Sequence, residues 1–68
     1  MFVIITTYEE FGTGNLTIRT QRTDNGRVAR ETFCAHIADH DCAACVVLDT
    51  LENNRCVFRY DQDRFEYV

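Results

Sequence analysis

Short stretches in which apolar and polar residues alternate limit this chain to a small set of folds. Residues 16–22 read LTIRTQR and residues 55–60 read RCVFRY, and both show the two-residue period of a half-buried strand. Residues 2–8 and 45–51 are rich in β-branched and aromatic residues, which also favours strands. Because 68 residues make a single small domain, 1–68, the strands are expected to share one sheet.

One stretch, from residue 29 to residue 40, has a helical period instead. Ala29, Phe33 and Ile37 recur every four positions. Two interpretations of the preceding TDNG stay open. In the first, Asp24 or Asn25 caps a helix. In the second, Asn-Gly forms a hairpin turn that leads into a third strand. We favour the helix, because it gives the sheet an apolar surface to pack against.

The expected fold is α+β, a single antiparallel β-sheet with one helix packed across it in the order β-β-α-β-β-β. The glycines of FGTGN turn the first hairpin, and residues 52–54, ENN, turn a later one. A last turn, DQD, leads into a fifth strand over residues 64–68. The rival interpretation replaces the first helix by a strand over residues 27–33 and runs a helix from residue 37 to residue 51.

The net charge of −4 arises entirely in the C-terminal part of the chain. Four acids balance four arginines before residue 39, and seven acids face three arginines from there on. Such a chain is repelled by nucleic acid and attracted by basic surfaces. We expect an anionic patch that imitates the phosphate track of nucleic acid, with tyrosines as anchors. The candidate partner-binding residues are Asp49, Glu52, Tyr60, Asp61, Asp63, Glu66 and Tyr67.

The decapeptide HIADHDCAAC holds the residue types of a zinc site. Two histidines four apart on a helix share a face, and Cys-x-x-Cys is a common ligand pair, so His36, His40, Cys42 and Cys45 are the candidate ligands. Structural zinc sites usually separate their ligand pairs by a dozen or more residues, whereas one residue separates these pairs. We therefore expect no metal and no cofactor, and keep a small zinc-binding adaptor as an alternative.

Redox and nucleophilic chemistry also find little support. A redox Cys-x-x-Cys needs its first thiol at a helix N-terminus, but Cys42 follows the predicted helix, and strand alternation would place Cys45 on the opposite face. Cys34, Cys45 and Cys56 are expected to be reduced thiols in the core. The chain has no serine, and Cys34 and His36 do not face each other on a helix. We expect no enzyme.

Four arginines within twelve residues support a further alternative, a nucleic-acid-binding module. Arg19, Arg22, Arg27 and Arg30 have only Asp24 among them, although the overall acidity favours a merely solvated face. No signal peptide or membrane-spanning run is visible, so a cytoplasmic location in the host cell is expected. Small size and open strand edges also favour a homodimer.

The second half of the chain carries a resemblance. Residues 46–68 read VVLDTLENNRCVFRYDQDRFEYV and follow the predicted helix. This order resembles phage anti-CRISPR proteins of β-β-α-β-β-β organisation, over roughly residues 29–68, while RTQRTDNGR departs from it. The resemblance implies a tiny acidic inhibitor of type I CRISPR systems that binds the effector complex and blocks target DNA or nuclease recruitment. Because these families share no common site, the resemblance gives no residue a role.

The expected function is therefore a non-enzymatic acidic binding protein. It would dock on a basic, nucleic-acid-binding surface of a larger protein or ribonucleoprotein complex and block that surface. Carboxylates would oppose arginines and lysines of the target.

Overall fold

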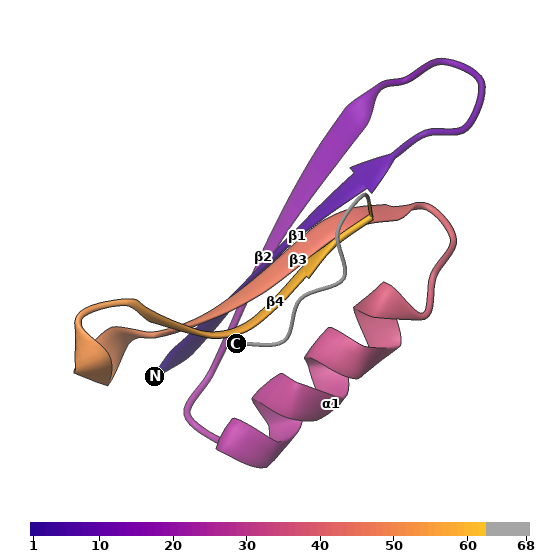
Figure 1. Ribbon diagram of the computed structural model, residues 1–68. Coiled ribbons are helices and arrows are strands. Elements are labelled where there is room, and N and C mark those ends of the chain that lie inside the picture. The colour runs from indigo at the N-terminus through magenta and orange to yellow at the C-terminus, as the bar shows by residue number, and fades with distance from the viewer. Residues whose placement is uncertain (63–68) are drawn as a thin grey trace.

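The computed structural model describes residues 1–62, and these form a four-stranded antiparallel sheet with one helix in the order β-β-α-β-β (Figure 1). The strand order in the sheet is β2-β1-β3-β4. The expected α+β class is confirmed, whereas the fifth strand expected over residues 64–68 lies outside the described residues. The elements are β1 (Phe2–Glu9), β2 (Leu16–Thr23), α1 (Gly26–Ile37), β3 (Cys42–Asp49), the 3-10 turn η1 (Thr50–Glu52) and β4 (Arg55–Asp61).

The helix begins where a side chain caps it. Asn25 has an extended backbone, and its side-chain oxygen accepts hydrogen bonds from the backbone amides of Arg27 at 2.9 Å and Val28 at 3.3 Å. These bonds satisfy amides that have no partner within the helix. The hairpin interpretation of Asn-Gly is therefore wrong, and so is the rival helix over residues 37–51, because β3 occupies most of that stretch. No helix within residues 1–62 is long and apolar enough to cross a membrane.

The core lies between α1 and the sheet, as the helical period predicted. Ala29 and Phe33 are buried, and the Phe33 ring stacks on that of Phe58 with 5.4 Å between the ring centroids. Ile4 and Val47, from the two central strands, complete the contact. Two of the thiols predicted for the core lie outside it. Cys34, next to Phe33, is exposed, because it lies beyond the edge of the narrow apolar stripe. Cys56 is half-buried and is paired with Leu48, outside the core cluster.

A β-bulge corrects the expected placement of the two central cysteines. Tyr8 is paired with Cys42 and Thr7 with Ala44, so Ala43 is an extra residue in β3. The bulge shifts the alternation by one residue, and both Cys42 and Cys45 face the core at 1% exposure. The opposite faces expected for Cys42 and Cys45 are therefore wrong, because strict alternation holds only for an unbroken strand.

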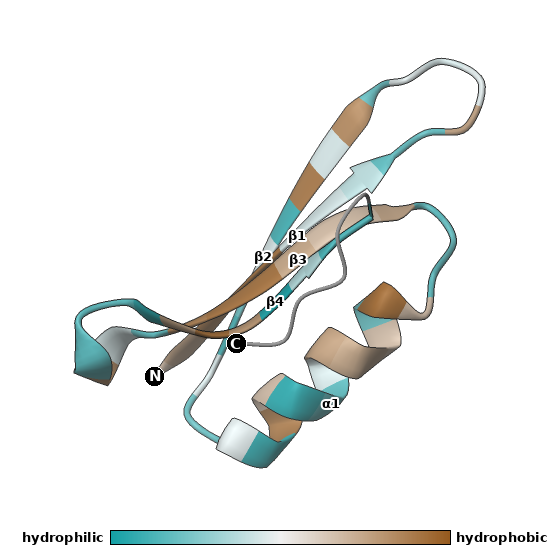
Figure 2. Ribbon diagram, in the orientation of Figure 1, coloured by the Kyte–Doolittle hydropathy of each residue, from teal (hydrophilic) through white to brown (hydrophobic). Residues whose placement is uncertain are grey.

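The first hairpin brings a second correction. The apolar residues of β2 were expected to be half-buried, but Leu16 and Ile18 are 63% and 67% exposed. They are paired with Glu9 and Thr7, so they share the sheet face that points away from α1, which we call the outer face. Figure 2 shows apolar segments on β2 as well as on β1 and β3.

The turns form where the sequence offers residues that tolerate a left-handed backbone. Gly12 and Gly14 have φ angles of 92° and 74° between β1 and β2. Asn53 and Asn54 have φ angles of 56° and 58° between η1 and β4. Asparagine adopts this region more readily than other residues with a side chain, so the predicted ENN turn is confirmed.

Truncation of the buried helix residue should cost far more stability than truncation of its exposed neighbour. We expect Phe33→Ala to lower the free energy of unfolding by about 3–5 kcal/mol, because it removes the ring that stacks on Phe58. Cys34→Ala is the control and should change that free energy by less than about 0.5 kcal/mol. Urea unfolding followed by circular dichroism measures both. Equal losses would contradict this orientation of α1.

Candidate functional site

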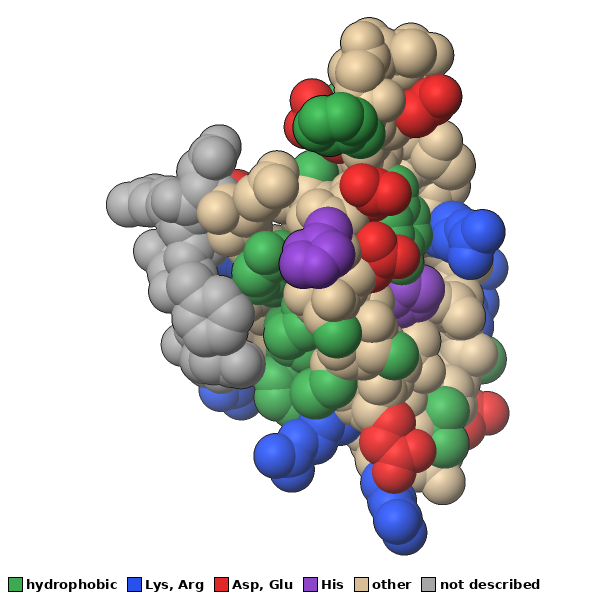
Figure 3. All heavy atoms as spheres, turned by 90° about the vertical axis from the view of Figure 1, so that its right-hand side faces the viewer, with side chains coloured by type: hydrophobic (Ala, Val, Ile, Leu, Met, Phe, Trp, Pro, Cys, Tyr) green, Lys and Arg blue, Asp and Glu red, His purple; other side chains and the backbone are tan. Residues whose placement is uncertain are grey.

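Carboxylates from distant segments meet at one end of the molecule. The backbone amide of Glu9, where β1 ends, donates to the carbonyl oxygen of Asp41 at 2.9 Å. The Asp39 side chain accepts from the Asp41 amide, also at 2.9 Å. We call Glu9, Glu10, Asp39 and Asp41 the acidic end. All four are exposed, and none forms an ion pair with another described residue. Figure 3 shows acidic side chains gathered beside a histidine on this side of the molecule.

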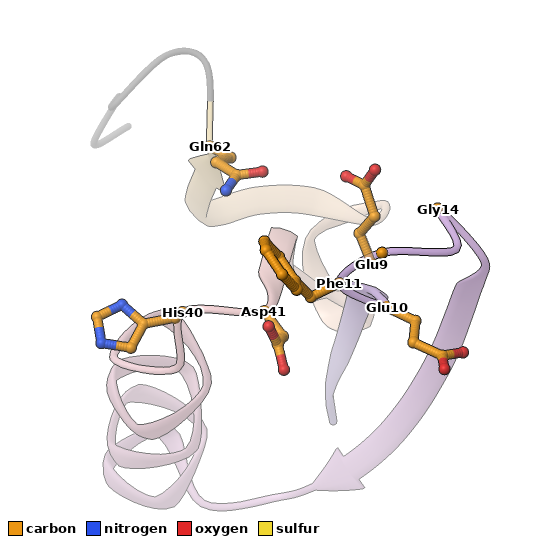
Figure 4. A pocket seen from close by; sticks show the side chains of 8 residues that line it. Glu9, Glu10, Phe11, Gly14, His40, Asp41 and Gln62 are labelled. Carbon is orange, nitrogen blue, oxygen red and sulfur yellow. The ribbon is translucent and has the colours of Figure 1, made fainter.

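A shallow pocket of about 240 Å³ opens at the acidic end (Figure 4). Glu9, Glu10 and Asp41 line it together with His40 and Phe11. Phe11 is 94% exposed, and Figure 4 shows its ring among the polar side chains of the pocket. An exposed aromatic ring surrounded by carboxylates suits a cationic side chain, because the ring face attracts a cation as the carboxylates do.

The structure does not gather the sequence-predicted patch in one place. Asp49 and Asp61 are paired with residues at opposite ends of the sheet, since Asp61 is opposite Ala44 on β3 and Asp49 is opposite Arg55 on β4. Asp49 lies five positions after Ala44 along β3, which corresponds to about 17 Å. Asp61 therefore lies toward the acidic end, whereas Asp49 and Glu52 lie at the other end.

The remaining predicted residues have other surroundings. The Asp49 carboxylate caps η1 by accepting from the Leu51 amide at 3.1 Å. Tyr60 packs against the core. Three predicted residues lie outside the described part of the chain: Asp63, Glu66 and Tyr67.

The arginine cluster of the sequence also divides. Arg19 is paired with Thr6 on the α1 side of the sheet, and its guanidinium lies 5.8 Å from the centre of the Tyr8 ring. Arg22 is opposite Val3 and so lies on the outer face. On α1, Arg27 forms an ion pair with Glu31 at 3.1 Å, and Arg30 is exposed. Because these side chains lie on both faces of the sheet and on the helix, they form no single surface for nucleic acid.

The proposed zinc ligands are likewise kept apart by other contacts. His36 is hydrogen-bonded through both ring nitrogens, while Cys42 and Cys45 point into the core. His40 lines the pocket at the acidic end. Among residues 1–62, no three His, Cys, Asp or Glu side chains are placed to hold a metal ion.

A hydrogen-bonded chain that the sequence did not reveal links both ends of the first hairpin to the helix. The Nε2 of His36 bonds the side-chain oxygen of Gln21 at 2.6 Å, and its Nδ1 bonds the Tyr8 hydroxyl. Because a Gln oxygen accepts, Nε2 carries the proton and Nδ1 accepts from Tyr8. These residues are 15 and 28 positions from His36, so no local spacing could signal them. The chain fastens the last turn of α1 to β1 and β2.

The thiols near these hydrogen bonds have raised pKa values, which disfavour nucleophilic chemistry. Burial raises the pKa of the Cys42 thiol to about 11, and the nearby Cys45 adds to the rise. Burial also raises the pKa values of Cys45 and Tyr8. The Cys45 sulfur lies 3.3 Å from the Thr6 hydroxyl, an additional sign that it is part of the core. Thiols with raised pKa values are protonated near neutral pH and are poor nucleophiles and metal ligands.

Comparison with known proteins gives no relative: no family model, no curated protein and no solved structure matches the chain.

The buried thiol should make the protein sensitive to alkaline pH. The Cys42 pKa rises from 9.0 to about 11 on folding, so the unfolded chain releases this proton first as the pH rises. Its contribution to stability is therefore complete below pH 9 and falls between about pH 9 and about pH 11. We expect a smaller fall in Cys42→Ala than in the parent protein, measured by urea unfolding across that range. Cys34→Ala, at an exposed site, should retain the parent's fall, and identical profiles for all three proteins would contradict the burial of Cys42.

Proposed function

We propose that this protein is a non-enzymatic binding protein whose acidic end docks on a basic, nucleic-acid-binding surface of a larger complex. The single observation that carries the proposal is the meeting of Glu9, Glu10, Asp39 and Asp41 at one end, with no ion pair to any described residue. Carboxylates that form no ion pair within residues 1–62 remain available to cations of another molecule. Steric and electrostatic occlusion of that surface would be the mechanism.

Phe11 supplies an anchoring side chain, which a purely acidic surface lacks. Interface energy concentrates in a few anchoring side chains, whereas exposed charges mainly steer association and set its salt dependence. Phe11 is 94% exposed at the tip of the first hairpin and borders the acidic pocket. An arginine of the partner would stack on the ring while the carboxylates of Glu10 and Asp41 oppose its charge. The acidic end would thus combine an anchor with a steering field.

The class of partner follows from the net charge and from the resemblance to phage anti-CRISPR proteins. A protein with a net charge of −4 is repelled by free nucleic acid but attracted to the protein surfaces that bind it. The proposed partner is a type I CRISPR effector complex, and the acidic end would occupy the basic track that the target DNA needs.

Reversing one charge at the acidic end should weaken this inhibition selectively. The assay is a gel shift of target DNA with a guide-loaded type I effector complex at low salt, titrated with the protein. Glu10→Arg should raise the half-inhibitory concentration by about tenfold, because like charges then face each other. Glu52→Arg is the matched control, since it makes the same charge change at the other end of the sheet. It should act within about twofold of the parent, because only location differs.

The outcomes separate the partner from the surface. Equal weakening by both variants would show that net charge matters and the acidic end does not. Absence of inhibition by the parent protein would remove the CRISPR complex as partner. Binding to an immobilised arginine-rich peptide, with the same two variants, then tests the acidic end by itself.

A further inference from the structure

The outer face of the sheet is apolar although it points away from α1. Val3 and Ile5 on β1 and Val46 and Leu48 on β3 are half-buried there, and Ile18 on β2 is 67% exposed. The alternation in β2 puts both of its apolar residues, Leu16 and Ile18, on this face, next to the polar Thr20 and Arg22. Strand register is strongly specified where it determines which side chains are buried. Leu16 and Ile18 would be buried in this register only if another molecule covered the outer face.

The register of the strands defines the centre of this face. Two rows of side chains cross the sheet next to each other: Ile5, Val46 and Arg59 form one row, and Thr7, Ala44 and Asp61 the other. They border a shallow groove of about 290 Å³. On β2, Thr20 continues the first row and Ile18 the second. Along β1 and β3 the groove is therefore lined by apolar side chains and one threonine, Thr7, and along β4 it carries one positive and one negative side chain.

We propose that a second copy of this chain covers the outer face, by face-to-face packing about a two-fold axis that lies between the sheets and perpendicular to their strands. An axis midway between the two rows places Arg59 of each copy opposite Asp61 of the other. It also places Val46 opposite Ala44 and Ile5 opposite Thr7, so larger side chains meet smaller ones. The face is self-complementary, as an isologous interface requires.

Long-range charge selects this axis over one that runs parallel to the strands. A two-fold axis parallel to the strands would bring the acidic ends of both copies side by side, where eight carboxylates repel one another. That axis would also place Arg59 and Asp61 opposite Thr20 and Ile18, with no charge pair. The perpendicular axis exchanges the strand ends. It therefore carries the two acidic ends to opposite sides of the dimer.

The area of the face indicates a weak dimer. Four strands about 4.8 Å apart and seven residues of about 3.3 Å each give a flat face of roughly 440 Å² per copy. Side-chain relief enlarges this, and two copies together come close to the roughly 1,000 Å² of a specific interface. A dimer that forms in the micromolar range and dissociates on dilution is expected.

Sedimentation velocity over a wide range of protein concentration tests the dimer. The parent protein should shift from monomer to dimer as its concentration rises. Val46→Arg places a charge in the groove and should abolish the dimer, whereas Val28→Arg, at a 43% exposed position on α1, is the control and should leave it intact. A monomer at every concentration, or a dimer that tolerates Val46→Arg, overturns the proposal.

Exchange of the two charges tests the axis with variants that leave the apolar residues of the groove unchanged. Arg59→Asp and Asp61→Arg should each raise the dissociation constant of the dimer by about tenfold, because each makes two like-charge contacts. The double variant R59D/D61R recreates both pairs across the proposed axis and should return to within about threefold of the parent. A double variant as weak as the single ones overturns the axis. Far-UV circular dichroism on every variant checks that the fold is retained.

Discussion

Within residues 1–62, one helix of twelve residues has to cover a sheet of four strands, and the rest of the structure follows from this mismatch. The helix buries one face through Ala29 and Phe33, which pack on Ile4 and Val47. The apolar residues at the alternate strand positions, such as Ile5, Val46 and Ile18, face away from it. A domain of this size buries only a modest fraction of its surface, so an apolar outer face has a high cost in stability unless another molecule covers it. This cost in stability favours the proposed association of two copies.

The bulge at Ala43 links the core to the acidic end. It turns both Cys42 and Cys45 inward, where burial raises their thiol pKa values and the Thr6 hydroxyl lies beside Cys45. It also comes directly after the corner that carries Asp39 and Asp41. In an unbroken strand one of the two thiols would face away from the core. The bulge instead buries both thiols between α1 and the sheet.

Local patterns predicted the elements well and their mutual placement poorly. The four-residue recurrence of Ala29, Phe33 and Ile37 located the helix and its buried stripe, because a helix has a fixed period. Alternation in LTIRTQR located a strand, but it says only which residues share a face. Pairing with β1 decides which face meets the helix, and that information is not local. The bulge has no signature in CAAC for the same reason. The acidic end joins residues about thirty positions apart, so a charge count along the chain could not bring these carboxylates together.

The acidic end and the outer face, the two proposed binding surfaces, together determine how a dimer would present its carboxylates. A dimer about an axis perpendicular to the strands projects its acidic ends in opposite directions, each with Phe11 at a hairpin tip. Such a particle cannot place both ends on one flat basic patch, yet it can bridge two patches that face each other across a channel. Binding of the first end raises the local concentration of the second, so a modest affinity at each end becomes a large combined one. This gain requires the dimer, whereas electrostatic docking of one end does not. Bridging therefore adds to the affinity only at protein concentrations at which the dimer forms.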